Sequence, residues 1–201
     1  MNYGPVYDPV DLVPFSFDLS SLVPRSVATL YSNLVTRPTG RAVRLGIESH
    51  IGELGSCCLS VLDFTQVVVL DYSCADEAVA KLVQRYLDGD RPADVYFVAR
   101  GLAEQHRDPI EAVLARHRLA LVAELAPHGF VLLGDVSEAE RSVWSALQQS
   151  GYGEAIGLAA AFGCGEVEMQ ELLESLARRR VVLRCQAPPG YHALSALITS
   201  A

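Results

Sequence analysis

The stretch LDYSCADEAVAKL, residues 70–82, holds the side chains of this chain that are best suited to chemistry. Asp71 ends an apolar run, Ser73 follows it closely, and Asp76 and Glu77 come next. A serine at the N-terminus of a helix can carry a phosphate, because free backbone N–H groups and the helix dipole stabilise the added charge. The neighbouring carboxylates act in the opposite sense and repel it. The pattern is therefore typical of a surface whose charge is switched by phosphorylation of Ser73.

The same residues have a second interpretation, in which they only build a helix. Ser73 is a suitable N-cap, and Asp76 in the fourth position gives a weak form of the capping box. Glu77 and Lys81 are spaced as an i,i+4 ion pair, which is worth about 0.2–0.5 kcal/mol in an isolated helix. This pair accounts for the only lysine of the chain. The sequence leaves both interpretations open.

The usual motifs of catalysis and metal binding do not occur in the sequence. Segment 151–157, GYGEAIG, has the wrong spacing for a dinucleotide loop and follows a helical pattern, so we interpret it as a helix–helix turn. There is no HExxH, GxSxG or P-loop motif. The five cysteines contain no CxxC pair, and we expect them to be reduced and mostly buried. We therefore expect no enzymatic activity, no metal and no cofactor.

The charge of the chain bears on its partners and its location. A net charge of −8 argues against a protein that coats nucleic acid, and it favours solubility and protein partners. The longest apolar runs are far shorter than the ~20 residues of a membrane-spanning helix. The first basic residue, Arg25, follows three aspartates, whereas a secretory signal begins with a basic region. We expect a cytoplasmic protein without a membrane span.

Apolar spacing predicts an extended, proline-rich arm at residues 1–24 and an α/β domain over 25–136. The turn Pro-His-Gly predicts a hairpin between the last two strands of this domain, and Asp108 and Pro109 predict the start of its last helix. The expected helices are 26–34, 40–54, 74–87 and 108–117, and the expected strands are 57–64, 67–70, 95–99, 119–125 and 130–133. Strands that alternate with helices are typical of a sheet covered by helices.

Residues 137–201 are predicted to form a smaller second domain of three helices and a β-hairpin. The helices are expected at 138–150, 154–162 and 166–179, and the hairpin strands at 181–185 and 191–194. This order resembles the winged-helix modules of transcriptional regulators. The resemblance implies that 166–179 takes the place of the recognition helix.

The expected recognition helix is acidic, which disfavours nucleic acid as its ligand. Its first turns, EVEMQELLE, carry four glutamates and no basic residue, so DNA phosphates would be repelled. We therefore expect the second domain to dock a protein. The alternative is a DNA-binding regulator whose α/β domain is a sensor and whose backbone contacts come from Arg178, Arg179, Arg180 and Arg184. These arginines also have a structural explanation, because they can offset the helix dipole and solvate the edge of the hairpin.

The segment CLSVLDFTQVVVLDYSCADEAVAKL resembles the STAS and STAS-like domains of bacterial anti-sigma-factor antagonists. In those domains an apolar strand ending in an Asp-Phe-type pair is followed by a short strand, an Asp-Ser-Ser-Gly-type loop and a helix. The upstream stretch TRPTGRAVRLGIESHI is similar to the helix that precedes this strand in the STAS-like branch. The resemblance covers about residues 36–133 and implies a STAS-like mixed sheet flanked by helices.

The resemblance also implies a role for the loop. Asp71 matches the loop aspartate, and Ser73 matches the serine that a partner kinase phosphorylates in the antagonists. Tyr72 stands where the first serine would be, and Cys74 replaces the glycine. We expect a bacterial-type signalling protein that binds a protein partner, such as an ATPase of the anti-sigma kinase type. The residues expected to contact this partner are Asp71, Tyr72, Ser73, Cys74, Asp76 and Glu77.

Overall fold

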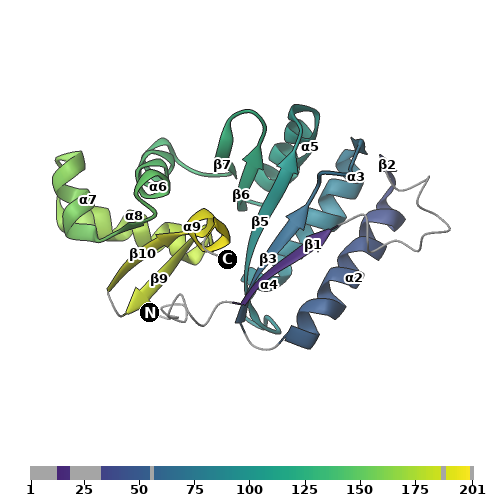
Figure 1. Ribbon diagram of the computed structural model, residues 1–201, viewed down its shortest axis with the longest axis horizontal. Coiled ribbons are helices and arrows are strands. Elements are labelled where there is room, and N and C mark those ends of the chain that lie inside the picture. The colour runs from purple at the N-terminus through teal and green to yellow at the C-terminus, as the bar shows by residue number, and fades with distance from the viewer. Residues whose placement is uncertain (1–12, 19–32, 55–56, 187–188, 200–201) are drawn as a thin grey trace.

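The structure, a computed structural model, describes residues 13–18, 33–54, 57–186 and 189–199 (Figure 1). It is a mixed α/β protein built around a five-stranded sheet in the order β1-β3-β5-β6-β7. The first four strands in this order are parallel, and β7 is antiparallel to β6. The strands are β1 (Val13–Asp18), β3 (Cys57–Asp63), β5 (Asp94–Leu102), β6 (Ala120–Leu125) and β7 (Gly129–Gly134).

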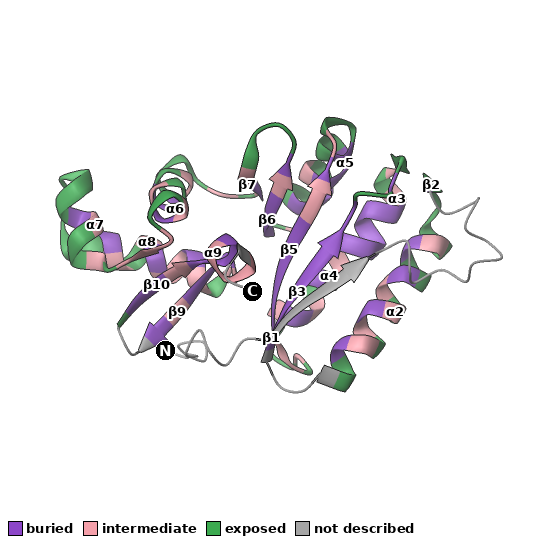
Figure 2. Ribbon diagram, in the orientation of Figure 1, coloured by how far each residue is buried: buried purple, intermediate pink, exposed green. Residues whose placement is uncertain are grey.

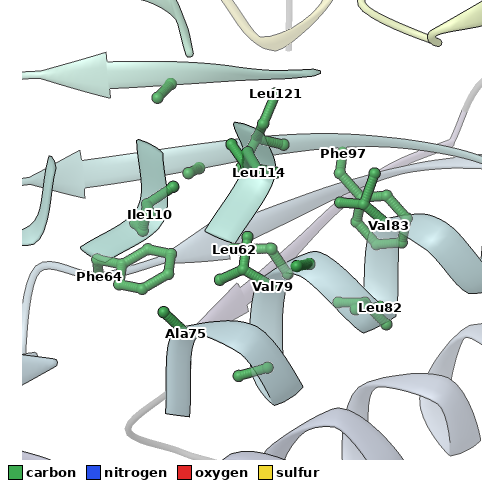
Figure 3. Close-up of a cluster of buried hydrophobic side chains, with 14 of the residues drawn as sticks. Leu62, Phe64, Ala75, Val79, Leu82, Val83, Phe97, Ile110, Leu114 and Leu121 are labelled. Carbon is green, nitrogen blue, oxygen red and sulfur yellow. The ribbon is translucent and has the colours of Figure 1, made fainter. Parts of the chain in front are cut away.

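Helices cover one face of this sheet. They are α2 (Arg37–Leu54), a continuous helical segment made of α3 (Tyr72–Ala75), η3 (Asp76–Ala80) and α4 (Lys81–Leu87), and α5 (Glu104–Arg116). The apolar core between the helices and the sheet is drawn in Figure 3, where Leu62 of β3, Val79 of η3 and Leu114 of α5 belong to one buried cluster. The core forms because the apolar residues of each helix recur at three- and four-residue steps and so share one side.

The opposite face of the sheet packs against the C-terminal part of the chain. Tyr96 and Val122 on that face form one buried cluster with Trp144 and Leu173. The C-terminal elements are α6 (Glu138–Ser150), β8 (Tyr152–Gly153), α7 (Ala155–Phe162), α8 (Glu166–Arg178), β9 (Val182–Gln186), β10 (Pro189–Ala193) and α9 (Leu194–Thr199). The domain boundary predicted at residue 136 falls between β7 and α6, and this cluster contains side chains from both sides of it.

Most of the elements predicted from apolar spacing are confirmed. The helix expected over 40–54 is α2, and its three predicted core residues, Val43, Ile47 and Ile51, are buried. The hairpin around Pro127 is formed by β6 and β7. The three C-terminal helices and the β9–β10 hairpin lie within one or two residues of their predicted bounds. These segments have strong local periodicity, which neighbouring elements reinforce.

One expectation about the first part of the chain is corrected, and the extended conformation expected for the arm is found in the part of it that the structure describes. Asn33–Leu34 forms a strand, β2, which pairs in parallel with β4 (Val69–Leu70), and the rest of the helix expected over 26–34 lies outside the described residues. Within the predicted arm, Val13–Asp18 is a strand of the main sheet, and the other arm residues lie outside the described part. Each of these two strands pairs with a strand that is distant in the sequence.

The start of α5 is also corrected. The helix begins at Glu104, so Asp108 is not its N-cap and Pro109 lies inside it. The Nδ1 atom of His106, which is buried, accepts a hydrogen bond from the backbone N–H of Ala103 at 3.2 Å. This interaction satisfies a backbone donor at the helix start in the way that an acidic side chain does in a capping box. A histidine in this role gave no sequence signal.

Gly40 sets how closely α2 approaches the α3–η3 segment. A Cβ atom added at Gly40 would lie 2.7 Å from the carbonyl oxygen of Cys74 and 2.9 Å from Cβ of Glu77. The first of these is backbone and cannot move aside alone. Gly52, near the end of the same helix, has no neighbouring atom within 4 Å of such a Cβ.

We predict opposite effects when alanine replaces these two glycines. Gly40→Ala should lower the free energy of unfolding by roughly 1–3 kcal/mol, because α2 must move away from Cys74. Gly52→Ala should raise it by about 0.4–1 kcal/mol, because the unfolded chain loses freedom and the helix meets no obstacle. Urea denaturation of both variants measures the difference. A Gly40→Ala protein as stable as Gly52→Ala would contradict the close approach of α2.

Candidate functional site

The Asp71 carboxylate joins two helices at the end of β4. Its Oδ1 atom accepts hydrogen bonds from the backbone N–H of Cys74 at 2.7 Å and from the hydroxyl of Ser73 at 2.9 Å. Its Oδ2 atom accepts one from the backbone N–H of Thr36 at 3.0 Å, just before α2. Burial alone would raise the pKa of Asp71, but these hydrogen bonds outweigh it and hold the pKa below its ordinary value. We call residues 71–74 the Asp71 corner.

The N-cap of this helix is Asp71, which corrects the expectation that Ser73 is the cap. Asp71 has an extended backbone with φ −89° and ψ 163°, and its side chain accepts from Cys74, as an N-cap does. Ser73 lies in the first turn and donates to the cap. An ionised carboxylate is a stronger acceptor for backbone N–H groups than a hydroxyl, so it takes the capping position.

Asp76 and Glu77, which we call the buried carboxylate pair, are 6% and 4% exposed. They lie in η3, a turn of π-helix, a conformation that is rare and often found at functional sites. Nη1 of Arg37 lies 2.9 Å from Asp76 and 3.0 Å from Glu77. The other basic groups around the pair are Arg44, Lys81 and His117, the last with its Nε2 atom 2.7 Å from Asp76. The predicted i,i+4 contact between Glu77 and Lys81 is confirmed.

Ion pairing keeps both buried carboxylates ionised. Burial alone would raise the pKa of Asp76, but hydrogen bonds from His117 and Arg37 outweigh it and hold the pKa below its ordinary value. For Glu77, hydrogen bonds from Lys81 and Arg37 likewise outweigh burial and hold the pKa below its ordinary value. Carboxylates held in this state are poor proton donors near neutral pH. The pair is better suited to fixing α2 against η3 than to acid–base chemistry.

The six residues expected to contact a partner differ in exposure. Tyr72 is 57% exposed, and Asp71 and Ser73 are partly exposed. Cys74, Asp76 and Glu77 are buried. Burial, together with the charges of Asp71 and Glu77, raises the pKa of the Cys74 thiol to about 12, so it is neutral at pH 7. Only the first half of the predicted contact segment therefore reaches the surface.

A group of exposed apolar side chains adjoins the Asp71 corner. Val35, Val68 and Val69 are 36%, 56% and 43% exposed, and with Tyr72 they form what we call the β2–β4 patch. The pairing of Leu34 with Leu70 turns these two leucines inward, which leaves Val69 on the outer side. Scattered exposed apolar residues are normal, but a group at one corner marks a surface suited to a protein partner.

Sequence analysis missed four residues of this site: Thr36, Arg37, Arg44 and His117. Arg37, Gly40 and Arg44 lie at i, i+3 and i+7, and all three approach the segment that contains Cys74 and Glu77. This spacing is a signal that could have identified one basic face of α2. His117 is at the end of α5 and gave no comparable signal.

Three of the four arginines considered for DNA contacts have partners within the protein. Arg180 pairs with Asp94, donates to the carbonyl of Val95 and lies 5.3 Å from the centre of the Tyr96 ring. Arg179 donates to the carbonyl of Arg118, and Arg184 pairs with Glu174 at 3.2 Å. Arg178 is exposed. Arg179 and Arg180 therefore attach the end of α8 to the main sheet and its loops, a role that sequence analysis did not consider.

A second charged group lies at the carboxyl ends of β3 and β5. Asp63 accepts hydrogen bonds from the backbone and hydroxyl of Thr65 at 3.0 and 2.7 Å, and from Arg100 at 2.5 Å. Burial alone would raise the pKa of Asp63, but hydrogen bonds from Arg100 and Thr65 keep it below its ordinary value. This group ties the loop after β3 to the neighbouring strand.

Comparisons of this chain with family models, curated proteins and solved structures give no match. The described part of the chain contains no cluster of three or more His, Cys, Asp or Glu side chains arranged to hold a metal ion. Within that same part, the helices are too short or too polar to cross a bilayer. The STAS-like resemblance and the phosphorylation of Ser73 stay predictions.

We predict that the folded protein loses stability in acid through this site. The pKa values of Asp71, Asp76 and Glu77 are lower in the folded protein than in the unfolded chain, so the folded state binds protons less readily. Their stabilising effect is full above the unfolded pKa values and is lost as pH falls below about 4.5. Asp76→Asn should cost roughly 1–3 kcal/mol at pH 7 and make the pH dependence shallower.

Chemical denaturation between pH 7 and pH 3 measures this effect. Asp90→Asn is the matched control, because the Asp90 side chain is 84% exposed in a surface ion pair and such pairs contribute little. Identical pH profiles for the wild-type protein and Asp76→Asn would contradict the assigned role of the buried carboxylate pair.

Proposed function

We propose that this chain is a cytoplasmic regulatory protein that binds a protein partner through the β2–β4 patch and the Asp71 corner. The observation that carries the proposal is the placement of exposed apolar side chains next to the partly exposed Ser73. The patch supplies apolar contact area, and the serine beside it offers a point where charge can be changed. Such a surface is suited to a partner that must be both bound and released.

Phosphorylation of Ser73 would act through Asp71. The Ser73 hydroxyl now donates to the Asp71 carboxylate, and a phosphate on that oxygen removes the donor and places a dianion beside it. Repulsion between the two anions displaces the Asp71 carboxylate and weakens the hydrogen bond that the Thr36 N–H donates to it. Because Thr36 follows Val35, the change reaches the β2–β4 patch. The switch thus alters both the charge and the shape of the docking surface.

The resemblance to STAS-like domains supports this assignment and suggests the partner. The order of a long strand, a short strand and a capped helix is the order that the resemblance implies around the loop. By the same resemblance the partner is an ATPase of the anti-sigma kinase type, which would phosphorylate Ser73. The protein itself would act by binding, without a reaction of its own.

A DNA-binding regulator is the second candidate. The order α6-β8-α7-α8-β9-β10 is the order of a winged helix, and this favours it. The acidic α8 and the internal partners of Arg179, Arg180 and Arg184 count against it. Titration with duplex DNA at several salt concentrations distinguishes the candidates, because specific DNA binding is steeply salt-dependent.

We predict that Ser73→Asp loosens the start of α2 without a partner being present. The backbone N–H of Thr36 should exchange with solvent about tenfold faster in Ser73→Asp than in wild-type protein, because the Asp71–Thr36 bond weakens. Ser73→Ala removes one donor but adds no charge, so it should leave this exchange rate nearly unchanged and cost about 0.5–1.5 kcal/mol. Amide hydrogen exchange measures both. Equal exchange rates of the Thr36 amide in the two variants would contradict the proposed switch.

We predict that removing apolar area from the β2–β4 patch weakens partner binding. A Tyr72→Ser/Val69→Ser double variant should retain less of the kinase-type ATPase in a pull-down from native cytoplasm, because the partner loses apolar contact area. Leu45→Ser is the matched control, since Leu45 is 49% exposed on α2 and lies outside the patch. Equal loss in the control and the double variant would argue against the patch as the docking site.

A further inference from the structure

The helix α7 is exposed but contains no polar side chain. Its sequence, AIGLAAAF, is entirely apolar, and Ala159 is its only buried residue. Ile156 and Phe162 are 61% and 43% exposed, and Val167 at the start of α8 is 75% exposed. Figure 2 shows most of α7 as exposed, at the end of the molecule away from α2. A helix that is apolar on all sides is normally buried, so this exposed apolar surface is suited to contact with another molecule. We call the surface formed by Ile156, Phe162, Val167 and the residues around them the α7–α8 face.

The charged side chains on either side of α7 in the sequence are all carboxylates. Between residues 142 and 177 the sequence contains no lysine, arginine or histidine, whereas it contains five glutamates. Glu154 precedes α7, and Glu166, Glu168 and Glu171 on α8 are exposed. The fifth, Glu174, is paired internally with Arg184. The exposed apolar side chains of α7 and α8 therefore lie among carboxylates.

A surface hollow of about 290 Å³ opens beside this face. It lies between the starts of α7 and α8 and the β9–β10 hairpin, and the residues that line it include Ile156, Glu166, Gln170 and Tyr191. Arg184 also lines it, but its charge is paired with Glu174 at 3.2 Å. The hollow combines an exposed apolar side chain with an exposed carboxylate. It has room for one large side chain of a partner, in the way that anchor residues fill pockets at protein interfaces.

We propose that the α7–α8 face binds a basic amphipathic helical segment of another protein. Apolar side chains of that segment contact Ile156, Phe162 and Val167, and one of them enters the hollow. Lysines or arginines on its flanks meet the exposed glutamates. This is the helix-in-groove mode of recognition, with charge complementarity selecting the partner.

The negative charge of the α7–α8 face makes three other ligands unfavourable: DNA, an anionic membrane and a second copy of this chain. DNA and an anionic membrane surface would both be repelled by the exposed glutamates. A second copy of this chain, docked by the same face, would bring Glu166 and Glu168 toward their own counterparts, which is unfavourable because an isologous contact pairs a surface with itself. A basic partner gains from the four exposed glutamates, and the one arginine at the hollow, Arg184, is already paired with Glu174.

This site is independent of the proposed function. It uses α7 and α8, whereas the Asp71 corner and the β2–β4 patch lie at the end of β4 and the start of α3. The protein could therefore join two partners. An experiment that shows no binding at one of these two sites leaves the evidence for the other site unchanged.

The test is fluorescence anisotropy of the full chain with a labelled, lactam-stapled helical peptide that has a leucine face and flanking lysines. A second peptide with the same leucine face and glutamates in place of the lysines is the matched probe. The basic peptide should bind at least about tenfold more tightly than the acidic one, and its affinity should fall as salt is raised. Equal binding of the two peptides, or no binding of the basic one, would overturn the proposal.

Variants locate the site. Ile156→Asn and Val167→Asn should each weaken binding of the basic peptide by about tenfold, and Glu166→Gln/Glu168→Gln should reduce the salt dependence. Leu45→Asn, a change at an apolar residue of α2 that is 49% exposed, should have no effect. Both asparagine variants replace exposed side chains, and their thermal melts should match the wild-type melt. Unchanged binding in both variants would contradict this location of the site. Self-association of the chain that Ile156→Asn abolishes would overturn the proposal, because the face would then bind a second copy.

Discussion

The hydrogen bonds of the Asp71 carboxylate are the interaction on which the candidate site depends. One side chain caps α3, receives the hydroxyl of Ser73 and holds the backbone just before α2. These segments are far apart in sequence, and a single ionised group sets their relative positions. A change of charge at Ser73 is therefore transmitted to two helices at once, which is the physical basis of the proposed switch.

The buried carboxylate pair reinforces the same junction. Asp76 and Glu77 project from a π-helical turn toward basic side chains of α2, while His117 reaches Asp76 from the end of α5. Breaking such a network by removing one partner is costly, because a charge is left buried without compensation. Gly40 permits the close approach of α2 that brings Arg37 and Arg44 within reach. Electrostatic pairing and backbone packing thus require each other here.

The C-terminal elements are attached to the sheet, and this affects how their surfaces can be used. Trp144 and Leu173 share one apolar cluster with Tyr96, and Arg180 reaches β5 with its charged end. Three of the four arginines that sequence analysis considered for nucleic acid, Arg179, Arg180 and Arg184, therefore make internal contacts. The described part of the chain does not bury Ile156 and Phe162 of α7, so the exposed surface of this part is acidic and apolar.

The sequence by itself determined the mixed α/β class, most helix and strand positions and the apolar residues of the core, because periodicity and turn residues are local signals. It also singled out Asp71, Ser73, Asp76 and Glu77. The tertiary structure alone decided that Asp71 is the cap, that the acidic pair is buried and that Arg37, Arg44 and His117 surround it. Long-range pairing also placed Asn33–Leu34 in a strand. These features depend on which distant segments meet, and the free energy of such contacts has no counterpart in local residue spacing.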